Sequence, residues 1–236
     1  MSVLKNRDEI TTARKQLAGR GLRVLPTRFE NLLRSLHITH EVAVGDVTKG
    51  WDVLKTIDFI GSNLDTAGAV LDIGAFSSEI LPILARMGFT DLVGVDLNPQ
   101  LSDMPTAGTI RYDVGDFLET SYPGCHFKAI TAISVIEHGY DGERLFHEVS
   151  RLLTPGGYFI ASFDYWPEKT DNGGLHPFGL SWTIFSREEV GAMIAKAAEF
   201  GLEPVGPLNF SAQDKAIAWE GREYTFAWIV LQKGRV

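Results

Sequence analysis

Two carboxylates and one glycine stand where apolar segments of the chain end. The apolar run 69–71 is followed by Asp72 and Gly74, and the run 92–95 is followed by Asp96. A glycine turn lets the backbone approach a ligand closely, and a carboxylate can accept two hydrogen bonds from a vicinal diol. Asp96 lies 22 residues beyond Gly74, a spacing typical of strand–helix–strand folds that bind the ribose of an adenosine-containing cofactor.

The loop after Gly74 distinguishes between such cofactors. Dinucleotide-binding proteins have the pattern G-x-G-x-x-G, which seats a diphosphate on a helix N-terminus. Here Phe76 and Glu79 occupy the second and third glycine positions, and we expect them to hinder and repel a diphosphate. S-adenosylmethionine contains the ribose and adenine but no phosphate, so it fits this loop better.

Five short motifs follow one another through the centre of the chain. They are residues 70–75 (VLDIGA), 93–97 (VGVDL), 115–117 (GDF), 133–138 (ISVIEH) and 152–157 (LLTPGG). Their order and spacing resemble those of the class I S-adenosylmethionine-dependent methyltransferases. The departures are Ala75 and Phe76, where many members have further small residues.

The resemblance implies a fold, a cofactor and a set of binding residues. The implied fold is α/β, a Rossmann-like, doubly wound, mostly parallel sheet of seven strands with an antiparallel last strand. Asp96 is expected to bind the ribose of S-adenosyl-L-methionine, and Asp116 the adenine amino group, with Asp113 as the competing acid. The expected cofactor-binding residues are Asp72, Gly74, Ala75, Asp96, Leu97, Asp116, Phe117, Ser134 and Glu137.

Two histidines are candidates for a general base. His138 follows the predicted strand 127–135, and an imidazole titrates near neutral pH; a structural role is the alternative. His176 lies in the long segment 164–182, which we expect to form a lid with Gly173 and Gly174 as its hinge. The alternative for this segment is an ordered aromatic cluster over the sheet edge. The substrate-binding residues expected in the lid are Tyr165, Trp166, His176 and Trp182.

Composition argues against several classes of partner. The net charge is −8, with 30 acidic and 22 basic residues, so no nucleic-acid partner is expected. The single cysteine, Cys125, excludes an internal disulfide and paired thiolate ligands. The histidines lack the spacing of metal-binding motifs, so we expect no metal. No stretch approaches the ~20 apolar residues of a membrane helix and no signal peptide is recognised, which favours a soluble cytoplasmic protein without a membrane partner.

Local patterns predict the domain organisation. One helix begins at the capping box Thr27–Glu30, and another spans 51–64 and buries Leu54, Ile57, Ile60 and Leu64. Residues 1–65 are expected to form a helical cap, and residues 66–236 the cofactor-binding core with the lid 164–182. Strands are expected at 69–73, 91–95, 108–112, 127–135, 158–163, 203–210 and 224–232, with a helix that starts at the capping box Ser186–Glu189.

These features predict a methyltransferase that acts on an oxygen or nitrogen atom of a small-molecule acceptor by in-line transfer. Two alternatives stay open: a carbon methyltransferase of the quinone or lipid type, and a cofactor-binding regulatory protein without transfer activity. A nicotinamide dehydrogenase fits less well because the loop lacks glycines. The sequence leaves open the acceptor and the oligomeric state, for which a homodimer is one option.

Overall fold

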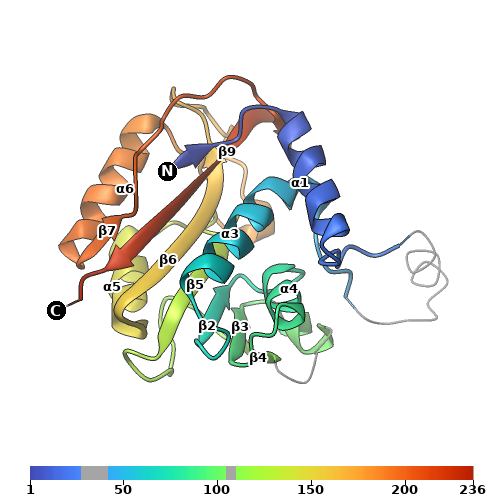
Figure 1. Ribbon diagram of the computed structural model, residues 1–236. Coiled ribbons are helices and arrows are strands. Elements are labelled where there is room, and N and C mark those ends of the chain that lie inside the picture. Colours follow the sequence, from blue (N-terminus) through green and yellow to red (C-terminus); the bar gives the residue numbers. More distant parts are fainter. Residues whose placement is uncertain (28–41, 105–109, 236) are drawn as a thin grey trace.

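The computed structural model describes residues 1–27, 42–104 and 110–235. A central sheet is flanked by helices on both faces (Figure 1). Its strands are β1 (Ser2–Val3), β2 (Val70–Ile73), β3 (Leu92–Asp96), β4 (Ile110–Val114), β5 (Phe127–Ile133), β6 (Leu153–Tyr165), β7 (Leu202–Pro204), β8 (Ile217–Trp219) and β9 (Arg222–Lys233). The α-helices are α1 (Arg7–Gly19), α3 (Gly50–Asn63), α4 (Ile80–Arg86), α5 (Gly142–Leu152) and α6 (Arg187–Glu199). Three short 3-10 helices are η1 (Val47–Lys49), η2 (Pro99–Asp103) and η3 (Pro177–Gly179).

The strand order confirms the predicted fold class. The sheet runs β1-β9-β6-β5-β2-β3-β4, and β7 and β8 also pair with β9. Strands β2 to β6 are parallel where they pair, whereas β9 is antiparallel to β6. The seven expected strands are present, and the short strands β1 and β8 raise the count to nine in the described residues. The strand order reverses at β2, which lies between β3 and β5, and ligands of such sheets bind beyond the carboxyl ends of the strands at this point.

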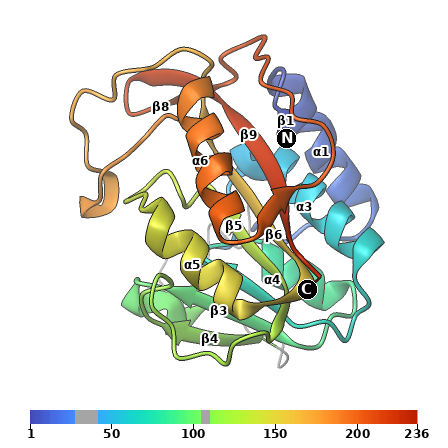
Figure 2. The same cartoon turned by 90° about the vertical axis from the view of Figure 1, so that its left-hand side faces the viewer.

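Alternate residues of the strands supply two separate cores. Leu71 of β2 packs with α5 and α6, whereas its neighbour Val70 packs with α3 and α4. In β9, Ile229 and Val230 divide in the same way. This period-two alternation buries both faces of the sheet, and Figures 1 and 2 show the two pairs of helices on opposite faces.

The N-terminal residues are joined to the core. β1 pairs with β9 at the sheet edge, and α1 packs against α3. α3 lies on the sheet, where Thr56 Oγ1 accepts a hydrogen bond from Trp228 Nε1 at 3.0 Å. Ile57 and Ile60 are buried as predicted, whereas Leu54 and Leu64 are only half-buried. The helix predicted from Thr27 lies outside the described residues beyond Thr27 itself.

Two predicted boundaries differ from the structure for local reasons. The helix expected from Ser77 or Ser78 begins at Ile80, because Ser77 has a φ of 62°, which is outside the helical region. The strand expected at 203–210 ends at Pro204, before Gly206 with its φ of 76°. The capping box that starts α6 is confirmed: Ser186 Oγ accepts from Glu189 N at 3.2 Å, and Ser186 N donates to Glu189 Oε2 at 2.8 Å.

Candidate functional site

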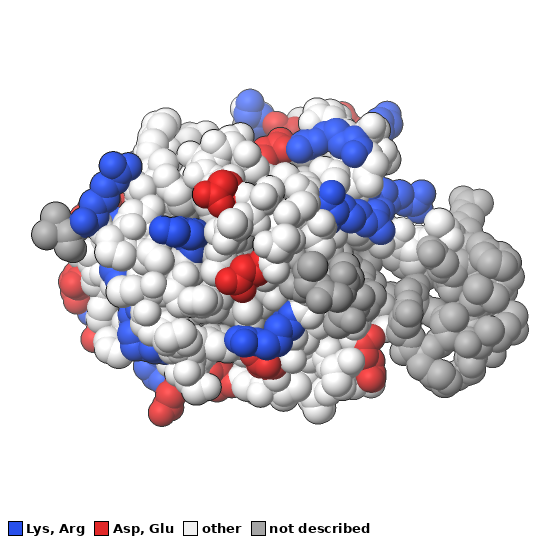
Figure 3. All heavy atoms as spheres, turned by 60° about the horizontal axis from the view of Figure 1, so that its bottom comes forward, with Lys and Arg blue, Asp and Glu red and all other residues white. Residues whose placement is uncertain are grey.

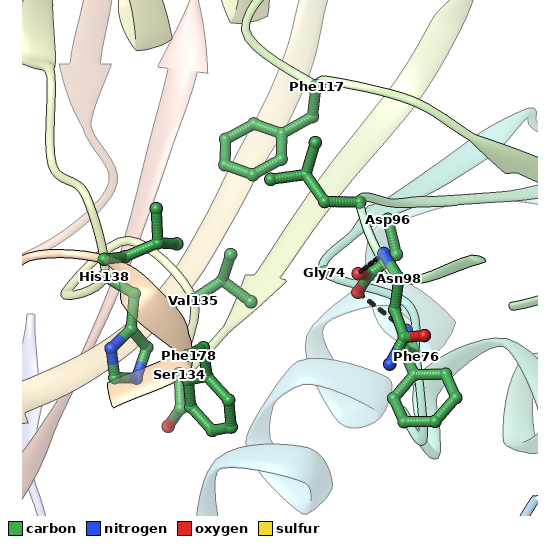
Figure 4. Close-up of a pocket in the computed structure, with 11 residues that line it drawn as sticks. Gly74, Phe76, Asp96, Asn98, Phe117, Ser134, Val135, His138 and Phe178 are labelled. Atoms are coloured by element: carbon green, nitrogen blue, oxygen red, sulfur yellow. Dashed lines mark hydrogen bonds between the residues drawn. The ribbon is translucent and has the colours of Figure 1, made fainter. Parts of the chain in front are cut away.

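A cavity of about 520 Å³ lies at the carboxyl ends of β2, β3 and β5. Figure 4 shows Phe76, Asp96 and Asn98 on one side of it and Ser134, His138 and Phe178 on the other. Its lining residues are Gly74, Phe76, Asp96, Leu97, Asn98, Phe117, Ser134, Val135, His138, Phe178 and Leu180. Six of the predicted site residues therefore line this one cavity. They are Gly74, Asp96, Leu97, Phe117, Ser134 and His138.

Gly74 makes the turn that opens the cavity. Its φ is +71°, and a Cβ at this position would lie 2.3 Å from Val135 Cγ2. Only glycine adopts this conformation without strain, and no side chain fits between the two loops. The absence of a side chain lets β2 end directly against the cavity.

Asp96 is oriented toward the cavity by the backbone around it. Its Oδ2 accepts from Phe76 N at 3.0 Å and its Oδ1 from Asn98 N at 2.8 Å, as drawn in Figure 4. An ionised carboxylate has about four acceptor sites. Two sites are therefore left for the two hydroxyl groups of a ribose.

Asp72 and Ala75 lie behind the cavity wall. Asp72 is buried, and its Oδ1 accepts from Thr131 Oγ1 at 2.5 Å, whereas Oδ2 has no partner among the described residues. Burial, aided by the nearby charge of Asp96, raises the pKa of Asp72 to about 7. Ala75 packs against Leu101 and Met104. Neither residue is in the lining, and their cofactor-binding roles stay predictions.

Asp116 lies outside this cavity. Its Oδ1 accepts from Leu118 N at 2.9 Å, and its Oδ2 pairs with Arg144 at 3.3 Å. It lines an adjacent depression together with Asp113, whose Oδ2 accepts from the Tyr122 hydroxyl at 2.8 Å. Leu97 and Phe117 form an apolar part of the cavity wall. The adenine contact of Asp116 stays a prediction.

A second cavity of about 270 Å³ adjoins the first, and we call it the acidic chamber. Ser134, His138 and Phe178 line both cavities. The other residues of the chamber come from η1, the residues after β5, the end of β6, β8 and β9. They are Asp46, Thr48, Lys49, Glu137, Asp164, Ile217, Ala218, Trp219, Tyr224 and Phe226.

Two buried carboxyl groups dominate the chamber. Glu137 is 1% exposed and Asp164 is 2% exposed. Asp164 Oδ2 accepts from Trp182 Nε1 at 2.8 Å, and the Tyr224 hydroxyl also donates to Asp164. Burial raises the pKa of Asp164 to about 6. Burial and the neighbouring charge of Asp164 raise the pKa of Glu137 well above its usual range, so these two groups resist ionising together.

His138 lies at the junction of the two cavities. Its ring contacts Phe178 at 5.2 Å and Trp219 at 6.1 Å between centroids. Burial, aided by the charge of Lys49, lowers the pKa of His138 to about 4, so its ring is neutral at pH 7. Its Nδ1 has no partner among the described residues.

The predicted substrate residues of the lid divide into buried and exposed sets. Tyr165 and Trp182 are fully buried, and the Tyr165 hydroxyl donates to the carbonyl oxygen of Phe210 at 2.7 Å. Trp166 is half-buried beneath the Lys215 ammonium, which is 5.0 Å from its ring centroid. His176 is exposed, with Nδ1 2.7 Å from the carbonyl oxygen of Gly174. None of these four lines either cavity in the structure, and their substrate roles stay predictions.

The structure adds four site residues that the sequence reasoning did not assign. Phe178, at 81% exposure, comes from the predicted lid and lines both cavities. Lys49, Trp219 and Tyr224 come from segments before and after the motif-bearing core. The aromatic content of 164–182 pointed to Phe178, whereas no local pattern marks the other three.

Other classes of site receive no support. Within residues 1–27, 42–104 and 110–235, no group of three or more His, Cys, Asp or Glu is placed to hold a metal ion. Across that same part of the chain, no helix has the length and apolar character needed to cross a membrane. The face in Figure 3 carries Lys and Arg side chains interspersed with Asp and Glu where the residues are described, unlike the continuous basic surface of nucleic-acid-binding proteins.

A mostly parallel sheet with a glycine turn and a carboxylate at its switch point is typical of Rossmann-like domains. Residues 71–161 match the family model described as a methyltransferase domain. The ubiquinone biosynthesis O-methyltransferase of Xanthomonas oryzae pv. oryzae is 30% identical over 115 residues, which cover 45% of this chain and 47% of that protein. The demethylmenaquinone methyltransferase of Deinococcus radiodurans is 31% identical over 98 residues, which cover 39% of this chain and 41% of that protein. The chain thus spans about half, or less, of the length of these relatives.

A solved structure extends the similarity over the whole fold. The crystal structure of the [4+2]-cyclase SpnF has a TM-score of 0.63 and 16% identity, and the match covers 96% of this chain and 94% of that one. At this identity the likeness shows the fold alone. Residues 71–161 are thus similar to methyltransferase domains, and the strand order is that of a Rossmann-like fold.

Proposed function

We propose that the chain transfers the methyl group of S-adenosylmethionine to an oxygen or nitrogen atom of a small-molecule acceptor. The observation that supports this most is the carboxylate of Asp96, which faces the cavity with two acceptor sites unused. Gly74 leaves room beside it that a Cβ would fill. These residues fit a ribose-containing cofactor without a diphosphate.

Two adjoining cavities fit a two-substrate reaction. S-adenosylmethionine, when bound, supplies a methyl group that its positive sulfur activates toward in-line displacement. The protein then has to hold the acceptor atom within about 3–3.5 Å of that methyl and exclude water. Ser134, His138 and Phe178 lie where the cofactor cavity meets the acidic chamber, so the acceptor atom is expected beside them.

His138, at this junction, is the predicted base for a hydroxyl acceptor. It has its pKa lowered to about 4 by burial, which makes it a weak base. An acceptor that is already ionised, or a neutral amine, needs no strong base. The base roles of His138 and His176 stay predictions.

The alternatives predict different products. Similarity to both a ubiquinone biosynthesis O-methyltransferase and a sterol 24-C-methyltransferase makes carbon the alternative acceptor. A cyclase with the same fold shows that the fold alone does not establish transfer. The test is incubation with methyl-labelled S-adenosylmethionine and a panel of phenols, carboxylates and amines. Location of the label on oxygen or nitrogen supports the proposal, and location on carbon contradicts it.

Binding tests the cofactor separately. We expect calorimetry to show binding of S-adenosylmethionine and S-adenosylhomocysteine but not of NAD. Binding of NAD without a response to either sulfur ligand would overturn the assignment.

A further inference from the structure

The acidic chamber holds more buried negative groups than positive ones. Asp52, Glu137 and Asp164 are each at most 2% exposed. Asp52 Oδ2 accepts from Ser162 Oγ at 2.8 Å, directly behind the chamber. The cation that acts on all three carboxyl groups is the single ammonium of Lys49. Because burying an unpaired carboxylate is costly, a second cation in the chamber would stabilise the ionised acids.

Unpartnered polar atoms face the same space. Ser134 Oγ, Glu137 Oε2 and His138 Nδ1 are buried and have no hydrogen-bond partner among the described residues. All three can act as acceptors, His138 in the tautomer with its proton on Nε2. Each of these atoms carries partial negative charge, and the carboxylate of Glu137 a full one when it is ionised. The unpartnered atoms therefore favour a positively charged group.

The aromatic walls of the chamber suit a cation as well. The ammonium of Lys49 already lies 4.2 Å from the ring centroid of Phe226. Phe178 and Trp219 also line the chamber, and their rings are stacked with an interplanar angle of 20°. Positive groups are attracted to such ring faces, most strongly to tryptophan. An anion would meet the buried carboxyl groups of Glu137 and Asp164 here, and a neutral group would gain no attraction from them.

We propose that the acidic chamber binds a positively charged quaternary ammonium group of the acceptor. The inference rests on the proposed function in one respect, that the molecule carrying this group is the methyl acceptor. Glu137 is the main contact, through Oε2, and the rings of Trp219 and Phe178 contact the cation.

Tetramethylammonium is the probe for this site, and tert-butanol is its neutral counterpart of similar shape. Both are titrated at millimolar concentration into protein saturated with S-adenosylhomocysteine, so that the cofactor cavity is filled. Binding is followed by tryptophan fluorescence and by NMR of the probe methyl groups. We expect tetramethylammonium to bind and tert-butanol not to bind.

Variants connect this binding to the chamber. Glu137→Gln keeps the shape and removes the charge, and we expect at least a tenfold loss of tetramethylammonium affinity with unchanged S-adenosylhomocysteine affinity. Trp219→Leu, at a half-buried position, should weaken the probe severalfold and serves if the glutamine variant fails to fold. The matched control is Glu143→Gln, because Glu143 is exposed on α5 and pairs with Lys196 at 3.0 Å.

The outcomes separate this inference from the proposed function. Absence of tetramethylammonium binding, equal binding of tert-butanol, or full affinity in folded Glu137→Gln or Trp219→Leu protein would overturn the inference while S-adenosylhomocysteine binding stands. Loss of S-adenosylhomocysteine binding in Glu137→Gln would assign Glu137 to the cofactor and also overturn it. Failure of the wild-type protein to bind S-adenosylhomocysteine contradicts the proposed function, and tetramethylammonium is then titrated without it.

Discussion

The substitution Asp96→Asn tests the cofactor site most directly. It preserves the size of the side chain but removes its charge and one of its two oxygen atoms. Both oxygens already accept a backbone N–H, from Phe76 and from Asn98. The amide NH₂ group of the variant must therefore face one of these donors, and the ribose keeps at most one good acceptor.

The expected loss follows from the missing bond. A hydrogen bond to a charged group contributes about 1.5–3 kcal/mol, and ~1.4 kcal/mol corresponds to a factor of ten in affinity. The affinity for S-adenosylhomocysteine should fall between about tenfold and somewhat more than a hundredfold. Asp96 is half-buried, so water can replace the lost loop contact, and the melting temperature should fall by only a few degrees.

Isothermal titration calorimetry with S-adenosylhomocysteine measures this loss, and circular dichroism checks the fold. Asp113→Asn is the matched control, because Asp113 lies in the neighbouring strand β4 but bonds to Tyr122 outside the cavity. We expect the control to bind as the wild type does. Wild-type affinity in folded Asp96→Asn protein would refute the ribose role.

Three further predictions concern the turn, the helix cap and the buried histidine. Gly74→Ala should lower the melting temperature and abolish measurable S-adenosylhomocysteine binding, because a positive φ costs about 1–2 kcal/mol and the Cβ would overlap Val135. Gly115→Ala, whose Cβ meets no atom within 4 Å, is the control and should change neither property. Equal effects of the two substitutions would contradict the reasoning. Ser186→Ala should lower the free energy of unfolding in urea by about 0.5–2 kcal/mol without changing cofactor affinity, and an unchanged urea midpoint would argue against the cap. His138 stays neutral down to about pH 4 in the folded protein, whereas it is protonated near pH 6.5 in the unfolded chain, so acidification through this window favours unfolding. His138→Gln should therefore gain stability relative to the wild type as the pH falls from 6.5 to 4. A difference in unfolding free energy between the two proteins that does not change with pH would count against the buried neutral ring.

Local patterns predicted the parts of the site that depend on neighbouring residues. Gly74 and Asp96 lie where strands β2 and β3 end, because strand periodicity and turn chemistry act over a few residues. The capping box at Ser186 is local in the same sense. These residues would be placed in the same way by any chain with this alternation of strands and helices.

Residues outside these patterns could not be placed from the sequence. Asp116 caps its own loop and pairs with Arg144 from α5, a contact that spacing does not reveal. Tyr165 and Trp182 are buried because packing large aromatic surfaces is worth more than exposing them to a cavity. Lys49 and Tyr224 meet at the chamber although they are separated by most of the chain, so only the tertiary structure brings them together.

The narrow junction of Ser134, His138 and Phe178 between the two cavities has an evolutionary consequence. The cofactor half is built from the motif-bearing loops after β2, β3 and β5, whereas most of the chamber wall comes from η1, β8 and β9. Under the proposed function, mutations in these outer segments are expected to change acceptor preference without altering the loops of the first cavity. Related chains are thus free to diversify in substrate by exchanging the outer wall, and directed evolution of a new specificity should begin with libraries in residues 46–49 and 217–226.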